Sequence, residues 1–349
     1  MKKILAVIVS VFSLMCLLIS CSNDGSVDDA FNRTITFDGN GATEGEMSVQ
    51  TIGIGKETRL SANTYERTKY LFTGWNTEAD GTGTSYEDRQ KIKISGNITL
   101  YAQWEIIPII LDSSMGGWTD GNVYVLNSNV SIFGHIIVSG SVTLILNDGC
   151  TLTVTKSIVV NEGNSLTINA SGEGSGILEA TGTAGSAGIG GDNGWSCGTI
   201  TINGGTVNAS GTDGGAGIGG GNDGAGGTIT INDGTVNASG ISGGAGIGGG
   251  NYGAGGTITI NDGTVNASGI SGGAGIGGGD DGAGGTITIN GGTVNASGIY
   301  GGTGIGSGLG GADDGTLKLG SGVSLEVSSD GSDWSDYDGT TRQMYMRTK

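Results

Sequence analysis

The second half of the chain alternates apolar and polar residues with a period of two, and the whole pattern repeats. A segment of 29 residues, TITINGGTVNASGTDGGAGIGGGNDGAGG, begins at Thr199. Nearly unchanged copies begin at Thr228 and Thr257, and a copy with one extra residue begins at Thr286. Alternation with period two predicts β-strands. In the first copy we expect strands at 199–203, 206–210 and 216–220, with the inward positions Ile200, Ile202, Val207, Ala209 and Ile218.

One copy holds too few apolar residues for a core of its own. If each strand stacks on its equivalent in the next copy, the inward residues form one continuous buried column. Short coils with three strands each resemble the right-handed parallel β-helix of pectate-lyase-like and autotransporter-passenger proteins. This resemblance implies an all-β fold for residues 111–349.

An asparagine that closes the first strand of each copy marks the phase of the coils. It stands at Asn203, Asn232, Asn261 and Asn290, and the upstream strands end in the same way at Asn127, Asn147 and Asn169. This spacing predicts about eight coils, with early coils of 20, 22 and 34 residues. At these corners the asparagine amides can form a ladder between coils. The final segment is expected to fold over the open end and to cover it with Trp334, Tyr337, Met344, Tyr345 and Met346.

Residues 34–104 form a separate module with a different composition. Its motifs are Phe37-Asp38-Gly39-Asn40-Gly41, Phe72-Thr73-Gly74-Trp75-Asn76, Gly81-Thr82-Gly83-Thr84-Ser85-Tyr86 and Leu100-Tyr101-Ala102-Gln103-Trp104. They resemble the internalin B-type (Listeria–Bacteroides) surface repeat, which implies a small β-grasp-like domain acting as a spacer or interaction module. We expect residues 38–41 to form a turn and residues 105–110, with Pro108, to be the linker. The expected core consists of Phe37, Phe72, Trp75, Tyr101 and Trp104.

The first 20 residues read as a signal peptide, because Lys2 and Lys3 precede an apolar run shorter than a membrane span. The sequence Leu18-Ile19-Ser20-Cys21 resembles the lipobox of bacterial lipoproteins, which implies acylation of Cys21, with palmitate among the chains, and membrane anchoring. Residues 21–33 then form a flexible tether. The alternative is a plain secretory signal with an incidental cysteine.

Composition narrows the choice of partners. Glycine accounts for 76 residues and proline for one, a bias typical of disorder, but here the glycines are periodic. Loss of residues 1–20 removes two lysines and no acid, so the formal charge changes from −18 to −20. Such a chain repels nucleic acid and anionic headgroups. Cys150 and Cys197 are expected to remain unpaired, because their places in the coils separate them by about 10 Å along the axis.

The repeats contain few of the residue types that enzymes use for catalysis. From Thr199 to Gly315 there is no Lys, Arg, His or Glu, which argues against a lyase or a histidine-dependent hydrolase. A glycoside hydrolase needs only two carboxylates and remains an alternative. We favour solvated turn positions for the repeat aspartates, and we expect no catalytic residue, cofactor or metal. The aspartates available to a hydrolase are Asp223, Asp233, Asp262, Asp280 and Asp281. The loops GGGNDGAGG and GGGDDGAGG resemble calcium-binding β-rolls, but those repeat every nine residues and these every 29, so we expect weak or no calcium binding.

One face of the repeats is a candidate ligand surface. Two outward threonines recur in each copy, and three aromatic residues lie near coil corners, where they could stack on sugar rings. Such threonine arrays resemble ice-binding faces, although threonine is also simply a good strand residue on a wet surface. The candidate residues are Thr199, Thr201, Thr228, Thr230, Thr257, Thr259, Thr286, Thr288, Trp195, Tyr252 and Tyr300.

Together these features predict a non-catalytic adhesion or carbohydrate-binding lipoprotein of the bacterial cell envelope, at the outer membrane or cell surface. Its expected partners are the membrane, through the acyl anchor, and a glycan or host matrix. A purely structural envelope or spacer protein is the first alternative, and a glycoside hydrolase is the second.

Overall fold

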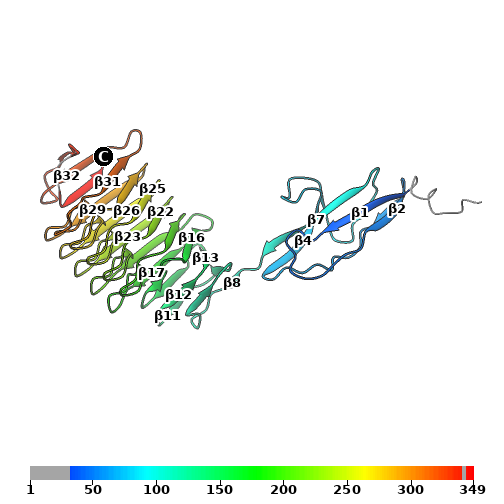
Figure 1. Cartoon of the computed structure of the whole chain (residues 1–349), viewed down its shortest axis with the longest axis horizontal. Helices are drawn as coiled ribbons and strands as arrows, with labels where there is room; N and C mark the ends of the chain where they lie inside the picture. The colour runs from blue at the N-terminus through cyan, green and yellow to red at the C-terminus, as the bar shows by residue number, and fades with distance from the viewer. Residues whose placement is uncertain (1–31, 340–342) are drawn as a thin grey trace, which may run out of the picture. The chain divides into compact units, whose positions relative to one another are not determined.

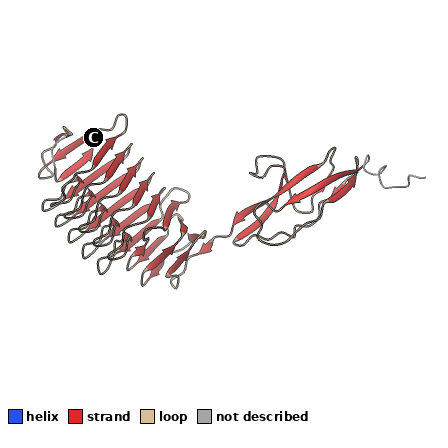
Figure 2. Cartoon of the chain, in the orientation of Figure 1, coloured by secondary structure: helices blue, strands red, loops and turns tan. Residues whose placement is uncertain are grey.

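The computed structural model describes residues 32–339 and 343–349, and every regular element in those ranges is a β-strand (Figure 2). The signal segment, Cys21 and nearly all of the tether lie outside the described residues. The chain divides into two compact units between Ile107 and Pro108. No helix in the described ranges is long and apolar enough to cross a membrane.

The N-terminal unit is a mixed sheet with the strand order β2-β1-β7-β4-β5. The first and last long strands pair in parallel at its centre, and the other pairs are antiparallel. The connection between β2 and β4 and the connection between β5 and β7 each contribute one short strand, and these two strands pair with each other. The sheet strands are β1 (Asn32–Asp38), β2 (Gln50–Gly53), β4 (Tyr70–Asn76), β5 (Ser85–Tyr86) and β7 (Ile98–Ile106), and the separate pair is β3 (Thr58–Arg59) with β6 (Lys91–Ile92).

Aromatic packing organises the core of this module. A register shift in β4 between Phe72 and Gly74 turns Phe72 and Trp75 to the same face, with ring centroids 5.0 Å apart. Phe37 packs on Trp75 at 4.8 Å, and Phe72 packs on Trp104 at 5.6 Å. The prediction that Tyr101 belongs to this core is wrong. Its neighbours Leu100 and Ala102 face inward, so strand alternation places Tyr101 on the opposite face.

The expected turn at residues 38–41 is present. Asn40 and Gly41 both have positive φ, and the Asn40 N–H donates to Asp38 Oδ1 at 2.8 Å.

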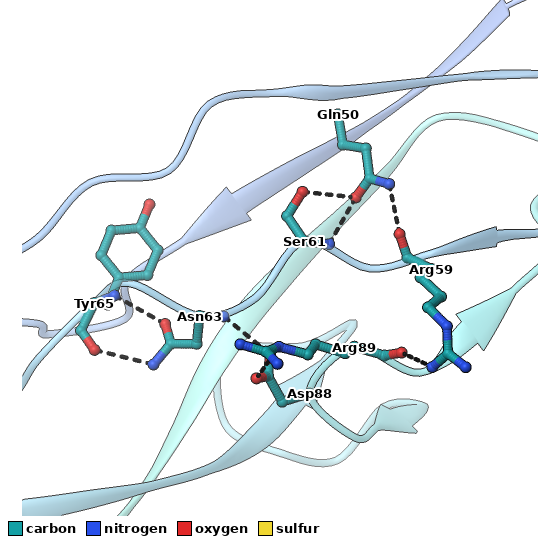
Figure 3. A network of polar contacts seen from close by, with 7 residues as sticks. All are labelled: Gln50, Arg59, Ser61, Asn63, Tyr65, Asp88 and Arg89. Atoms are coloured by element: carbon teal, nitrogen blue, oxygen red, sulfur yellow. Dashed lines mark hydrogen bonds and ion pairs between the residues drawn. The ribbon is translucent and has the colours of Figure 1, made fainter.

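Polar side chains tie down the long connections of the module (Figure 3). The Gln50 amide accepts from the Ser61 N–H at 3.0 Å and donates to the Arg59 carbonyl at 2.7 Å. Arg59 in turn donates to the Arg89 carbonyl, and the Asn63 N–H donates to Asp88 Oδ1 at 2.9 Å. These contacts satisfy backbone groups in and around the short strand β3 and in the connections beside it, so the cluster is structural.

The C-terminal unit is a parallel β-helix built from three sheets (Figure 1). Its long parallel sheets with regular repeats fit a right-handed β-helix, the hand that is the rule for crossovers between parallel strands of one sheet. The TITI sheet contains β8 (Ile109–Ile110), β10 (Val123–Leu126), β13 (Ser141–Leu146), β16 (Ser165–Ala170), β19 (Thr199–Ile202), β22 (Thr228–Ile231), β25 (Thr257–Ile260), β28 (Thr286–Ile289) and β31 (Thr316–Leu319).

The other two sheets follow the same order along the axis. The TVNAS sheet contains β11 (Val130–Ile132), β14 (Thr151–Val154), β17 (Ile177–Thr181), β20 (Thr206–Ser210), β23 (Thr235–Gly240), β26 (Thr264–Gly269) and β29 (Thr293–Gly298). The IG sheet contains β9 (Gly117–Thr119), β12 (Ile136–Ser139), β15 (Ile158–Val159), β18 (Ile189–Gly190), β21 (Ile218–Gly219), β24 (Ile247–Gly248), β27 (Ile276–Gly277) and β30 (Ile305–Gly306).

The repeats stack in register, so that Ile200 pairs with Ile229 and Val207 with Val236. All five predicted inward positions of the first copy are buried and belong to one continuous core. Within the described residues eight turns separate the nine strands of the TITI sheet, the expected number, and seven of these turns also contain a strand of the TVNAS sheet. Because β7 runs to Ile106 and β8 starts at Ile109, the connection between the units is shorter than the expected 105–110 linker.

One coil length was predicted wrongly. Leu144 pairs with Ile168 and Leu146 with Ala170, so this coil has 24 residues, where the asparagine spacing indicated 22. Ser171, and not Asn169, takes the place above Asn147 and donates to its Oδ1 at 2.8 Å. A shift of two residues keeps every side chain on its original face, so the apolar pattern alone could not detect it.

Glycine lets the coils approach closely at the IG sheet. Gly248 has φ +135°, and a Cβ atom there would lie 2.0 Å from the carbonyl oxygen of Gly277 in the next coil. Gly219 has the same relation to Gly248. The glycine repeats are therefore required by coil stacking, which explains their period.

The C-terminal segment covers part of the open end. β34 (Tyr345–Thr348) pairs antiparallel with β29 and with β32 (Leu325–Ser328), which in turn pairs with β33 (Ser335–Asp336). Met346 is buried in the core, as expected for a cap. The cap was expected to hide both the apolar column and the unpaired edge at the open end, and it does so only in part. Within the described residues only the TVNAS sheet gains extra strands, and Leu319 on β31 stays exposed.

Candidate ligand-binding groove

The predicted threonine face forms on the outer side of the TITI sheet. Thr199, Thr228, Thr257 and Thr286 stand in one in-register column. A second column contains Thr201, Thr230, Thr259 and Thr288. All eight side chains are exposed or half-buried, so the predicted geometry is confirmed. Ligand binding by this face stays a prediction.

The three predicted corner aromatics are exposed but do not form one site. Trp195, Tyr252 and Tyr300 are 58%, 60% and 74% exposed. Tyr252 lies in the loop after the IG strand, whereas Tyr300 lies in the loop before it. No ring contact joins any two of them in the described part of the chain.

Another candidate site lies on the outer side of the TVNAS sheet. A groove of about 500 Å³ crosses four successive strands, β20, β23, β26 and β29, and ends against the cap. Its floor repeats the same three residues from each coil. These floor residues are Asn208, Ala209, Ser210, Asn237, Ala238, Ser239, Asn266, Ala267, Ser268, Asn295, Ala296 and Ser297, and the cap contributes Trp334, Tyr345, Met346 and Arg347.

The asparagines of the groove form a hydrogen-bonded ladder. Asn237 donates to Asn208 at 2.8 Å, Asn266 donates to Asn237 at 2.9 Å, and Asn295 donates to Asn266 at 2.9 Å. A carboxamide offers two N–H donors and two acceptor positions. Each middle asparagine therefore keeps one N–H and one acceptor position outside the ladder. Beside it, the Ser210 and Ser239 hydroxyls lie 3.0 Å apart.

The cap builds one end of the groove. The Arg347 guanidinium lies 3.9 Å from the centroid of the Trp334 ring. Its Nε and Nη2 donate to Glu326 Oε2 at 3.1 and 2.9 Å. The ion pair and the ring contact hold Arg347 from two sides, so this end of the groove is preorganised.

The asparagine ladder of the corners is also present, on the TITI side. Asn232 donates to Asn203 at 2.6 Å, Asn261 to Asn232 at 2.7 Å and Asn290 to Asn261 at 2.7 Å. This ladder was predicted from the sequence, whereas the ladder in the groove was not. The period-two pattern placed Asn208 and its equivalents outward, and their identical spacing was a usable signal for a second ladder.

The repeat aspartates do not converge on one point. Asp233 accepts from its own loop at the Gly234 N–H, and Asp262 does the same at Gly263. In the described ranges no group of three His, Cys, Asp or Glu side chains is placed to hold a metal ion. These carboxylates act as turn residues in this structure.

Cys150 and Cys197 are both free thiols, as predicted. Cys197 is buried and lies two residues before the start of β19. Burial raises the pKa of its thiol to about 12, and a hydrogen bond with the Gly191 backbone offsets a smaller part of that shift. At neutral pH it is a protonated core group, with no thiolate available for chemistry.

Family models match segments in both units of the chain. Residues 34–103 match the Listeria-Bacteroides repeat domain, and residues 200–222, 229–251, 258–280 and 287–309 each match the Beta helix repeat. Both resemblances expected from the sequence are thus confirmed. No solved structure matches the chain.

Two proteins of Evansella cellulosilytica are similar to part of the chain. One, provisionally named a Gly-rich membrane protein, is 40% identical over 75 residues, which is 21% of this chain and 9% of the relative. The other, provisionally named a membrane protein, is 34% identical over 76 residues, which is 21% of this chain and 11% of the relative. The similarity thus covers about a tenth of each relative's length.

Proposed function

We propose that this chain is a lipid-anchored protein of the bacterial cell envelope. We propose further that it binds neutral glycans in the groove of the TVNAS sheet and does not cleave them. One observation carries the proposal. An uncharged floor of amides and hydroxyls, repeated over four coils, meets aromatic side chains at one end.

The chemistry of the groove suits sugars. The free N–H and acceptor positions of Asn237 and Asn266 match hydroxyl groups, which both donate and accept. Tyr345 offers apolar ring surface with a polar edge, the usual partner for the face of a pyranose ring, and Trp334 lies beside it with one face covered by Arg347. Sites of this kind combine a few oriented polar groups with aromatic surface.

The charge distribution favours a neutral ligand. The floor holds no ionisable side chain, and the only charged residue that lines the groove, Arg347, is already paired with Glu326. The chain as a whole carries a formal charge of −18, so an acidic polysaccharide would be repelled.

The residues that line the groove also support binding without catalysis. Hydrolysis of a glycosidic bond generally requires two carboxylates on either side of it. The residues that line the groove include no Asp or Glu. The sole histidine, His135, lies in an early coil, with Nδ1 2.9 Å from the Ser157 hydroxyl.

The envelope location rests on the sequence and on the relatives. Cys21 follows a lipobox-like segment, and both Evansella relatives carry the word membrane in their names.

Growth with radiolabelled palmitate should label the full chain and leave a Cys21→Ser variant unlabelled. Labelling of the variant would overturn the anchor. Protease treatment of intact cells would then decide between surface display and a location below the surface.

A glycan array with soluble Cys21→Ser protein that lacks residues 1–20 tests the ligand. We expect signals on neutral glycans, lost in Ser239→Trp, which fills the groove floor. The matched control Thr230→Trp puts the same ring on the TITI sheet and should bind normally. Loss of binding only in Thr230→Trp would move the site to the threonine face. Silence of the unsubstituted protein on every glycan would favour the structural spacer.

A further inference from the structure

The two ends of the groove differ. The asparagine column continues from Asn295 to Arg347 on β34, and the serine column continues from Ser297 to Tyr345. Each column of short side chains is therefore followed on β34 by one long side chain, Arg347 or Tyr345. The Trp334 ring lies beside them and is covered by Arg347. We call Trp334, Tyr345 and Arg347 the end wall.

The opposite end has no such wall. The residues in register with Asn208 and Ser210 are Glu179 and Thr181 on β17, and both are exposed. The next strand outward, β14, places Thr153 beside Glu179, and Thr153 donates to its carboxylate at 3.1 Å. The floor therefore passes out to the surface at β17, which we call the open mouth.

The end wall is held rigidly. Glu326 and Arg347 are opposite each other on β32 and β34, and the charged hydrogen bonds between them fix the guanidinium over Trp334. The Met346 side chain between Tyr345 and Arg347 is buried in the core. A wall anchored in the core and by an ion pair does not move aside easily, so a long chain cannot run through it.

We propose that the groove recognises one terminus of a linear neutral glycan, with the terminal residue against the end wall and the chain leaving through the open mouth. The inference rests on the function proposed above and adds the direction and the end of the ligand. Three strand spacings separate β20 from β29, which gives a floor of about 14 Å and room for about three pyranose units.

Immobilised oligosaccharides test the inference. Linear neutral hexasaccharides of glucose, mannose, galactose, xylose and N-acetylglucosamine are attached to the array through either the reducing or the non-reducing end. We expect binding to a given sugar with only one of the two attachments, because the other buries the recognised terminus in the surface. Equal binding with both attachments, lost in Ser239→Trp, would overturn end recognition and leave the proposed function standing. Absence of binding to any sugar would overturn both.

A variant at the open mouth gives an independent test. Thr181 is exposed, so Thr181→Trp should fold normally while placing a ring where the chain leaves. We expect free hexasaccharide to bind at least about tenfold more weakly in this variant, while a trisaccharide that ends inside the groove binds within about twofold. The control Thr167→Trp carries the same ring on the TITI sheet. Unchanged hexasaccharide binding in Thr181→Trp would show that the chain does not leave there and would overturn the proposal.

Discussion

The side-chain amide of Asn266 donates to Asn237 Oδ1 at 2.9 Å, and the Asn237 amide makes the same contact with Asn208 at 2.8 Å. Asn237 is thus both donor and acceptor in a chain of aligned amides, and such chains polarise one another. This relation joins stability to the proposed binding surface, because the same side chains form the floor of the groove.

Removing a middle member of this ladder should destabilise the β-helix measurably. Asn237→Ala eliminates two hydrogen bonds, which contribute about 0.5–1.5 kcal/mol each to the free energy of unfolding. Thr235→Ala on the same strand is the control, since Thr235 also faces outward, and it should change stability by less than about 0.5 kcal/mol. Urea denaturation measures both. Equal losses in the two variants would mean that the ladder contributes nothing beyond an ordinary surface residue.

Neighbouring residues on one strand should differ sharply in their contribution to stability. Ile258 is fully buried in the apolar column, whereas Thr259 faces outward on the same strand. Ile258→Ala should lower the free energy of unfolding by about 2–5 kcal/mol through lost burial and a residual cavity. Thr259→Ala should stay within about 1 kcal/mol. A larger loss in Thr259→Ala, measured by the same urea titration, would contradict the inward register.

Coil stacking at the IG sheet should tolerate no side chain at Gly248. The added Cβ would lie 2.0 Å from the Gly277 carbonyl oxygen, and φ is +135°. Gly248→Ala should therefore lower the free energy of unfolding by more than about 3 kcal/mol or abolish soluble folding. At Gly134 an added Cβ meets nothing within 4 Å, and Gly134→Ala should be nearly neutral. Thermal unfolding followed by circular dichroism compares them, and an intact Gly248→Ala protein would refute the close stacking.

Cys197 should resist alkylation in the native protein. Burial raises the pKa of its thiol to about 12 from an ordinary value of 9.0, so iodoacetamide at pH 8 should modify the half-buried Cys150 first. Mass spectrometry of proteolytic peptides locates the label, and denaturation in urea should make both sites equally reactive. Rapid native labelling of Cys197 would contradict its place in the core.

The same pKa shift predicts lower stability in alkali. Between about pH 9 and 12 the unfolded chain loses the Cys197 proton and the folded chain keeps it, so the free energy of unfolding falls as pH rises through this window. A Cys197→Ala variant should show a smaller decline than the parent over that range. An identical decline in both proteins would assign the effect to other groups.

The repeats made much of the fold predictable from the sequence alone. Copies of 29 residues can stack in only one way that keeps Ile200 on Ile229 and each apolar side chain inside, so the strands and the buried column followed from the period. The free state of both cysteines followed from the same spacing. The early coils have no such copies, and there the two-residue shift at Asn147 was invisible because it preserves the faces.

Only the tertiary structure decided where a ligand could bind. The outward positions of Asn208 and Ser210 could be read from alternation, but their enclosure depends on a non-repeating segment more than a hundred residues away. Nothing in the local pattern of Trp334 or Arg347 states that β34 pairs antiparallel with β29. A repeat encodes contacts at one fixed separation in sequence. The groove ends where the repeats end, because the cap strand β34 pairs there with β29 of the last repeat. That pairing depends on packing and hydrogen bonding between segments that share no sequence repeat.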